Sequence, residues 1–271
     1  MFTVNPSSAP LIDIGANLTH ESFKDDFDQV IERAQQANIS HMIITGSDLD
    51  NSTSAIKLAQ HNPQLFSATA GFHPHHADQF NEDTSRALSE LLQKHQVCAV
   101  GETGLDFFRD ISPREQQIKS FIAHLELARQ FNKPLFLHQR DAHDEFFGVL
   151  QEHRASLGRI VVHCFTDTDR ALQAYIDLDC YIGITGWICD ERRGAHLLDC
   201  VSAIPLERLM IETDAPYLMP RTLRPKPKTR RNEPCTLPLV LETIASARPE
   251  SETELAVATS DNAKRFFDIP N

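Results

Sequence analysis

Short apolar runs alternate with longer segments of helical spacing along the whole chain, and this alternation restricts the fold more than any other feature. The apolar runs predict strands at residues 11–15, 41–45, 65–71, 97–102, 134–138, 159–163, 180–184 and 208–212. Between them, apolar residues at helical spacing predict helices near residues 21–37, 50–60, 81–94, 113–131, 141–154, 167–177 and 191–202. Eight strands that alternate with helices predict an α/β fold, the (β/α)8 TIM barrel.

Polar side chains at the strand ends favour this barrel over a doubly wound open sheet. An open sheet gathers ligands mainly at one switch point, whereas a barrel brings the carboxyl ends of all its strands to one mouth. The fourth run stops at Glu102, and a glycine turn is expected after it. Six predicted strands end near ligand-capable groups, namely Asp13 and Asn17, His73 and His75, Glu102, His138, His163, and Asp214.

Length and composition predict one domain. With 271 residues and 41% hydrophobic content, residues 1–271 are expected to form a single TIM-barrel hydrolase domain. No apolar run approaches the roughly 20 residues of a membrane span, and the first residues lack a secretory signal pattern. The cysteines are scattered without a CxxC pair and suit reduced core thiols. These features predict a soluble, monomeric, cytoplasmic protein.

The charge distribution bears on the substrate. A formal net charge of −12 argues against an extended duplex-binding surface. Residues 221–231 nevertheless carry six cations and no acid. A charge run is usually a solvated loop, but this one follows Asp214 closely and is therefore also a candidate phosphate-binding loop. Its candidate substrate-binding residues are Arg224, Lys226, Lys228 and Arg231, with Glu233 beyond them.

The residue types at the strand ends indicate metal chemistry. A lone histidine after a strand is more often a packed side chain than a ligand, but two histidines, a glutamate and an aspartate at equivalent positions suit a divalent ion. Imidazole and carboxylate together bind Zn²⁺, Mn²⁺ or Mg²⁺, and a glutamate can bridge two ions. Such ions activate water and stabilise a leaving oxygen. A metal-assisted hydrolase is therefore predicted.

Several motifs, in order along nearly the whole chain, resemble the TatD family of metal-dependent deoxyribonucleases. The resemblance implies a TIM barrel, Mg²⁺-dependent 3′-to-5′ exonuclease activity on single-stranded DNA and RNA, and a role in DNA repair or degradation. It also implies that Glu102, His138 and His163 bind metal, with Asp214 as a further ligand or as the group that orients the attacking water. The motifs are Gly71-Phe-His-Pro-His75, Gly101-Glu-Thr-Gly-Leu-Asp-Phe107, His138-Gln-Arg-Asp141, His163-Cys-Phe-Thr166, Glu212-Thr-Asp-Ala-Pro-Tyr217 and Arg231-Asn-Glu-Pro234.

The first predicted strand departs from the family pattern. Most members of the wider family have a His-x-His sequence there, whereas this chain offers Asn17 and Thr19. A neutral amide and a hydroxyl are weak ligands. One of the two usual sites is therefore expected to be weak or to fill only with substrate, Mg²⁺ is favoured over Zn²⁺, and the number of ions, one or two, stays open.

Other residues have both a functional and a structural interpretation. His73 and His75 can contact phosphate, and His75 is the preferred proton donor to the leaving oxygen; loop packing is the alternative. Arg192 and Arg193 can bind a phosphate, or they only solvate a helix start. Stacking of bases on Phe107, Trp187 or Tyr217 competes with core packing.

The main interpretation is a cytoplasmic exonuclease that acts on the 3′ ends of single-stranded DNA or RNA. Glu102, Asp214 and His75 are the predicted catalytic residues. An amidohydrolase or an aminoacyl-tRNA deacylase on the same scaffold is the alternative among enzymes. The basic loop, residues 221–231, argues against a small neutral substrate. A non-catalytic, metal-containing nucleic-acid-binding protein is the alternative from another class.

Overall fold

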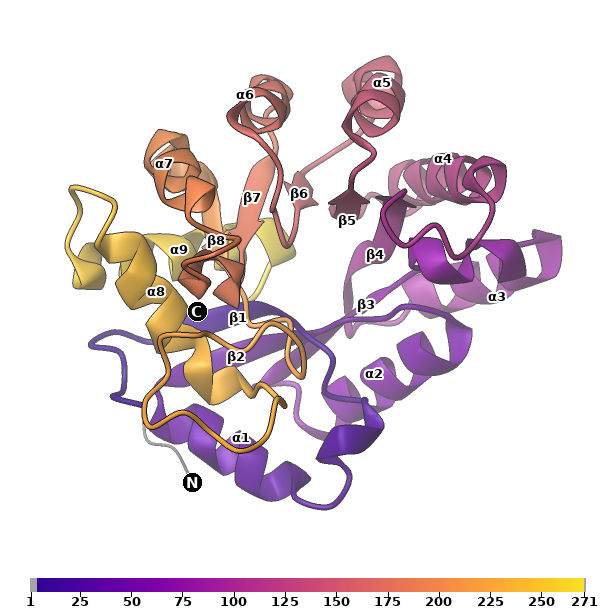
Figure 1. Ribbon diagram of the computed structural model, residues 1–271. Coiled ribbons are helices and arrows are strands. Elements are labelled where there is room, and N and C mark those ends of the chain that lie inside the picture. Colours follow the sequence, from indigo (N-terminus) through magenta and orange to yellow (C-terminus); the bar gives the residue numbers. More distant parts are fainter. Residues whose placement is uncertain (1–3, 271) are drawn as a thin grey trace. The chain divides into compact units, whose positions relative to one another are not determined.

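The structure, a computed structural model that describes residues 4–270, has the predicted alternation of strands and helices (Figure 1). Within that range eight strands follow one another in the sheet in chain order. They are β1 (Leu11–Ala16), β2 (Ile39–Ile44), β3 (Phe66–Ala70), β4 (Val97–Asp106), β5 (Leu135–Arg140), β6 (Ile160–Val162), β7 (Tyr181–Ile184) and β8 (Leu209–Ile211). This topology confirms the predicted TIM-barrel class.

The helices occupy the connections between the strands. They are α1 (Phe27–Gln36), α2 (Leu49–His61), α3 (Glu82–Leu92), α4 (Arg114–Phe131), α5 (His143–His153), α6 (Asp169–Asp177), α7 (His196–Ala203), α8 (Leu237–Ala245) and α9 (Glu252–Phe267). No helix in the described range is long and apolar enough to cross a membrane. The residues predicted to lack a secretory signal lie partly outside the described range, because that range begins at residue 4.

Contacts within the chain group it into two compact units. The first comprises Met1–Ile43, Cys164–Thr168 and Ile182–Asn271, and the second comprises Ile44–His163 and Asp169–Tyr181. That residues 1–271 form a single domain stays a prediction.

The second unit holds β3 to β6, which pair in parallel. Helix α4 packs on β4 and α2 packs on β3, so these strands are buried on their outer side as well (Figure 1). Phe121 of α4 stacks on Phe146 of α5 with ring centroids 5.1 Å apart, and both rings are fully buried. Burial of two such rings contributes several kcal/mol to the core, at roughly 1.5–3 kcal/mol for each.

The first unit joins the end of β1 to the segment after β8. The backbone N–H of Asn17 donates to the carbonyl of Ala215 at 2.7 Å, and that of Asp214 donates to the carbonyl of Gly15 at 2.8 Å. Helix α9 packs on both strands. Two segments far apart in sequence thus lie side by side, which places Asn17 next to Asp214.

Strand β4 differs from the prediction. It does not end in a glycine turn after Glu102 but continues to Asp106. Gly101 and Gly104 have φ values of 144° and 138°, which only glycine adopts readily, and a Cβ on Gly104 would lie 1.9 Å from the carbonyl oxygen of His138. The register with β5 shifts around Glu102. The glycines therefore make a bulge at which β4 approaches β5 closely.

Two helices begin later than predicted. The expected helix at residues 21–37 is divided, because Glu21–Phe23 forms a separate 3-10 turn before α1 begins at Phe27. The expected helix at residues 191–202 begins only at His196. The backbone N–H of Arg192 donates instead to the side chain of Asp190 at 3.0 Å, a local bond that competes with helix formation. Helices α8 and α9 follow the last strand and were not among the predicted helices.

Asp13, one of the polar groups at the predicted strand ends, is a buried structural residue. It accepts hydrogen bonds from the backbone N–H groups of Gly15 and Thr213 at 3.2 and 2.9 Å, and from the Thr213 hydroxyl at 2.5 Å. Burial raises the pKa of Asp13 to about 7, although these three hydrogen bonds act in the opposite direction.

This raised pKa predicts a pH-dependent stability. Asp13 titrates near pH 4 when unfolded, so it stabilises the fold fully below about pH 4, and this stabilisation is lost as the pH rises to about 7. Between pH 5 and pH 8 the wild type is expected to lose about 3 kcal/mol more unfolding free energy than Asp13→Asn, whose amide does not titrate. Urea unfolding at both pH values measures the difference. Parallel losses in the two proteins would contradict the assignment.

Candidate metal centre

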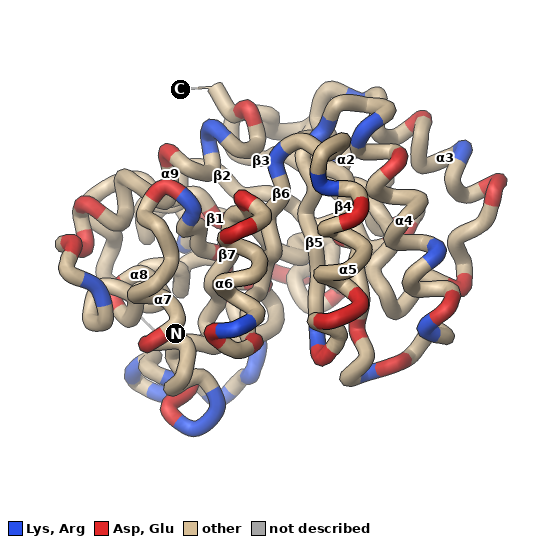
Figure 2. Tube along the Cα trace, turned by 90° about the horizontal axis from the view of Figure 1, so that it is seen from above, with Lys and Arg blue, Asp and Glu red and all other residues tan. Residues whose placement is uncertain are grey.

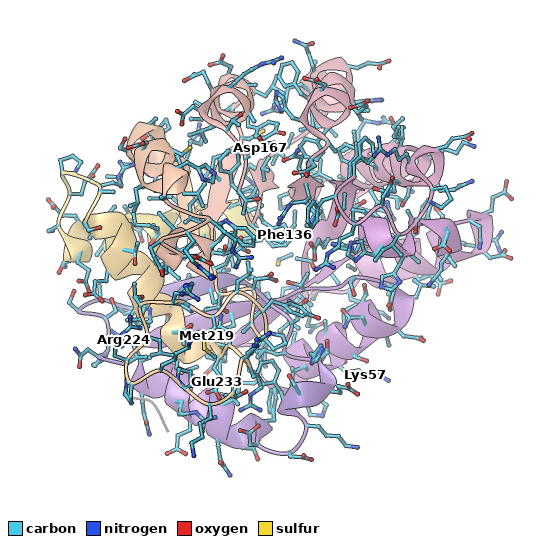
Figure 3. All side chains as sticks on the ribbon, viewed as in Figure 1. Lys57, Phe136, Asp167, Met219, Arg224 and Glu233 are labelled. Atoms are coloured by element: carbon cyan, nitrogen blue, oxygen red, sulfur yellow. The ribbon has the colours of Figure 1, made fainter. Side chains whose placement is uncertain are left out.

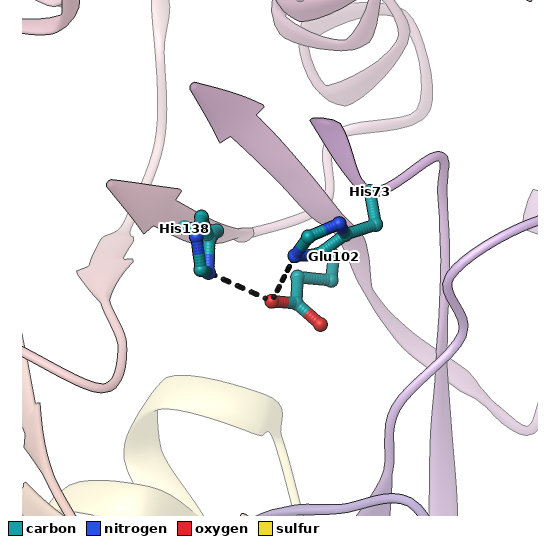
Figure 4. A group of neighbouring side chains, drawn as sticks. All are labelled: His73, Glu102 and His138. Carbon is teal, nitrogen blue, oxygen red and sulfur yellow. Dashed lines mark ion pairs between the residues drawn. The ribbon is translucent and has the colours of Figure 1, made fainter. Parts of the chain in front are cut away.

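Two histidine side chains of the second unit, His73 and His138, lie around the carboxylate of Glu102 (Figure 4). Oε1 of Glu102 lies 3.1 Å from Nδ1 of His138 and 3.4 Å from Nε2 of His73. One ligand atom from each of the three residues lies within 4.8 Å of the others. Nε2 of His163 also contacts the same oxygen at 2.8 Å. A buried carboxylate with imidazole groups around it is a donor set for a divalent cation.

Neighbouring parallel strands bring these residues together. Glu102 lies in β4 and His138 in β5, and His138 is in register with Gly104 of β4. His163 directly follows β6, and its ring stacks on Phe136 with centroids 4.2 Å apart. His73 follows β3. Neighbouring strands or the residues just after them thus supply one side chain each. Glu102 and His138 lie inside their strands and not at the ends where the sequence pattern placed them.

The protonation state of Glu102 suits metal binding. Burial raises the pKa of Glu102, but the neighbouring His73 and His163 and the hydrogen bonds with His138 and His163 outweigh it and hold the pKa well below its usual range. Burial lowers the pKa of His73 to about 3. At neutral pH Glu102 is therefore an ionised carboxylate, the form that binds metals, and His73 is a neutral imidazole. Burial lowers the pKa of His138, but the neighbouring carboxylates of Asp106 and Glu102 outweigh it and raise the pKa overall, so a metal ion at His138 has to displace a proton.

A ring nitrogen of His138 that lacks a hydrogen-bond partner among the described residues shows whether a metal ion would fit the cluster. Nε2 of His138 is buried and has no hydrogen-bond partner among residues 4–270; its nearest carboxylate oxygen, in Asp106, is 3.6 Å away. A buried polar atom without a partner is costly, and a metal ion would satisfy it. Both ring nitrogens of His73, in contrast, have partners. Its Nδ1 accepts a hydrogen bond from the backbone N–H of His75 at 3.1 Å. The proton of the neutral ring is therefore on Nε2, which faces Glu102. We therefore expect His73 to steady the carboxylate, and Glu102 and His138 to bind the ion.

Sequence reasoning missed Asp106. Its Oδ2 accepts a hydrogen bond from Nε2 of His75 at 2.8 Å. Burial raises the pKa of Asp106, but the nearby His138 and hydrogen bonds with His75 and the backbone of Arg109 outweigh it and lower the pKa overall. Asp106 holds His75, the predicted proton donor, next to the metal centre. A signal existed, since Asp106 lies an even number of residues after Glu102 and such residues share one face of a strand.

The other predicted site residues belong to the first unit. Asn17 donates through Nδ2 to Oδ1 of Asp214 at 2.9 Å, so these two predicted residues are adjacent. Arg192 and Arg193 both pair with the buried Asp190, at 3.3 and 2.9 Å. Their guanidinium groups remain more than half exposed, which leaves room for a further anion.

Some cations of the basic loop pair with carboxylates of the protein, and others do not. Arg231 pairs with Asp26 at 2.7 Å and with Glu233 at 2.8 Å, and Glu233 also pairs with Arg33 at 2.7 Å. Glu233 therefore anchors the end of the loop. Arg224 donates to two carbonyl groups of the loop itself. Figure 3 labels Arg224 and Glu233 along this loop, and Figure 2 shows that Lys and Arg lie among Asp and Glu along most of the trace.

Lys226 and Lys228 have no ion-pair partner within the described part of the chain. Both line a pocket of about 580 Å³ between the basic loop and α1. Unlike Arg221 and Arg231, which pair with carboxylates, these two lysines keep their charge free of an ion pair among the described residues.

Parallel strands that bring a carboxylate and imidazole groups together define a class, the metal-dependent hydrolases with a TIM-barrel fold. Comparison with known families is more specific. The model of the TatD-related DNase family matches residues 12–268, and the chain belongs to this family. The predicted metal-dependent nuclease is thereby confirmed over the amidohydrolase, deacylase and non-catalytic alternatives.

Relatives match over nearly their whole length. One from Edwardsiella piscicida is 49% identical over 257 residues, which are 95% of this chain and 99% of the relative, and it is named 3′-5′ ssDNA/RNA exonuclease TatD. One from Escherichia fergusonii has the same name and is 47% identical over 96% of this chain and 99% of its own length. A solved TatD homolog from Escherichia coli is 28% identical, with a TM-score of 0.88 over 96% of this chain and 98% of that one.

Proposed function

We propose that this protein removes nucleotides from the 3′ ends of single-stranded DNA and RNA with the help of a divalent metal ion. The cluster around Glu102 carries the proposal, because it offers an ionised carboxylate and an unsatisfied imidazole nitrogen at one point. The shared name of the relatives supports the direction and the substrate. We further propose Mg²⁺ as the ion, bound at one or two sites, since Asn17 and Thr19 are oxygen donors without charge.

The chain's own residues have separate tasks in this reaction. A divalent ion held by Glu102 and His138, with His163 beside them, would polarise the phosphate and lower the pKa of a water molecule. His75 donates a proton to the leaving 3′ oxygen, and Asp106 fixes its ring for that step through the 2.8 Å contact. Asp214, held by Asn17, orients the attacking water. The protein's monomeric state, cytoplasmic location and role in DNA repair stay predictions.

End-labelled oligonucleotides test the proposal. A single strand labelled at its 5′ end should give a ladder of products that shorten one nucleotide at a time in Mg²⁺, and the same strand labelled at its 3′ end should release the label at once. A chelator should stop both reactions. Release of the 5′ label first, or undiminished activity in chelator, would refute the proposal.

The unpaired lysines predict a specific change in salt dependence. Replacing Lys226 and Lys228 with Gln is expected to raise KM for an oligonucleotide and to flatten the slope of log K against log salt by about 1.4, because each phosphate contact on a single strand contributes about 0.7. Lys119→Gln is the matched control, since Lys119 already pairs with Glu115 on α4. An unchanged slope in the double variant would leave the loop without a role in binding substrate.

A further inference from the structure

One exposed aromatic residue, Phe108, follows β4, the strand that carries Glu102 and Asp106. Among the described residues, the large apolar side chains with high exposure are Phe108 at 56%, Ile111 at 62%, Tyr217 at 51% and Val257 at 47%. A single exposed apolar residue is ordinary. Phe108 is unusual because two arginines lie over its ring and because its backbone N–H is hydrogen-bonded to Asp106.

Two guanidinium groups lie against the ring of Phe108. The central carbon of Arg140 is 4.7 Å from the ring centroid, and that of Arg109 is 5.9 Å from it. Both distances are within the range of a cation–π interaction. Arg109 has no carboxylate partner within residues 4–270. Phe108 therefore combines an exposed aromatic side chain with positive charge over its ring.

Hydrogen bonds tie the backbone of this residue to the metal centre. The backbone N–H groups of Phe108 and Arg109 donate to Oδ1 of Asp106 at 3.0 and 2.8 Å, while Oδ2 of the same carboxylate accepts Nε2 of His75 at 2.8 Å. Arg140 ends β5, two positions after His138, and is in register with Asp106. The backbone of Phe108 is therefore fixed relative to His75 and Asp106.

The aromatic residues singled out from the sequence are less suited to stacking. An arginine lies over each ring, Arg114 at 4.2 Å from the centroid of Phe107 and Arg193 at 4.4 Å from that of Trp187. Both aromatic residues are less exposed than Phe108, so they leave less ring surface for a base. Tyr217 is exposed but belongs to the other unit.

We propose that the exposed surface of Phe108, together with the adjacent Arg109 and Arg140, is a stacking subsite for a nucleobase of the single-stranded substrate beside the scissile phosphate. This inference rests on the proposed function and deepens it. Every base has a π-face, so such a subsite accepts all sequences. The two arginines add attraction for the base and for the adjacent phosphate. The subsite would hold the strand end steady while His75 donates its proton.

Variants of one ring test the subsite. Phe108→Ala is expected to raise KM for a single-stranded oligonucleotide about 5- to 150-fold, the range of base–aromatic stacking, whereas Phe108→Trp should keep wild-type KM. Ile111→Ala is the matched control, because Ile111 is equally exposed and lies in the same segment. With a strand whose last nucleotides at the 3′ end are abasic, Phe108→Ala and the wild type should have the same KM, since no base remains to stack.

A binding measurement separates this inference from the proposed function. Fluorescence anisotropy with a labelled single strand in chelator reports binding without hydrolysis, and Phe108→Ala should weaken it by a similar factor. An equal loss on abasic and normal strands, an equal loss in Ile111→Ala, or unchanged binding in Phe108→Ala would overturn the subsite. A wild type that degrades no strand would instead overturn the proposed function.

Discussion

Replacing Glu102 with Gln is expected to lower hydrolysis of single-stranded DNA by more than about 100-fold. Loss of a group that only supports a metal ligand typically costs 10- to 100-fold, and Glu102 is a proposed ligand itself. Its Oε1 is the atom at which His138, His73 and His163 converge. The amide keeps the shape of the side chain but loses its charge, so the barrel should still fold.

Steady-state hydrolysis and isothermal titration calorimetry with Mn²⁺ measure this prediction. His138→Ala should lose activity and metal affinity together, in the same way as Glu102→Gln. His76→Ala is the control, because His76 follows His75 directly but is more exposed and lies 4.0 Å from Asp48. Thermal unfolding shows whether each variant is folded. A folded Glu102→Gln protein with near-native activity would remove Glu102 from the metal set.

Asp214→Asn is expected to lower kcat by about 100- to 10,000-fold, the range for a positioned acid or base, with KM little changed. The amide oxygen can still accept the hydrogen bond from Asn17, now 2.9 Å from the carboxylate, so the local structure should persist. Asn17→Ala should have a smaller effect, because it frees Asp214 without removing its charge.

Asp261→Asn on α9, an exposed carboxylate of the same unit, is the control for this change. Single-turnover kinetics separates the chemical step from product release. If Asp214→Asn changes KM but leaves kcat intact, Asp214 contacts substrate and does not orient water.

The sequence predicted the class of fold because its apolar residues follow simple strand and helix patterns. Apolar runs and helical spacing located eight strands, and the predicted groups His138, Glu102 and His163 converge within the second unit as expected. Strand β4 was misjudged, since a glycine after Glu102 suggests a turn, and only the backbone conformation of Gly101 and Gly104 shows a bulge.

The candidate site was harder to predict because pairing depends on distant residues. Arg231 looked like a substrate cation, but Asp26 and Glu233 hold it, and no local pattern announces a partner so far away in sequence. Asp106 was missed because its partner, His75, follows a different strand. Predictions for single residues therefore stay weaker than the prediction of the fold.

Anomalous diffraction from crystals grown with Mn²⁺ tests the metal centre most directly. We expect a peak within about 2.0–2.4 Å of a Glu102 carboxylate oxygen and of a His138 ring nitrogen, and no peak there in Glu102→Gln. An ion bound elsewhere in a protein that is active with Mn²⁺, with no peak beside Glu102 and His138, would contradict the proposed centre.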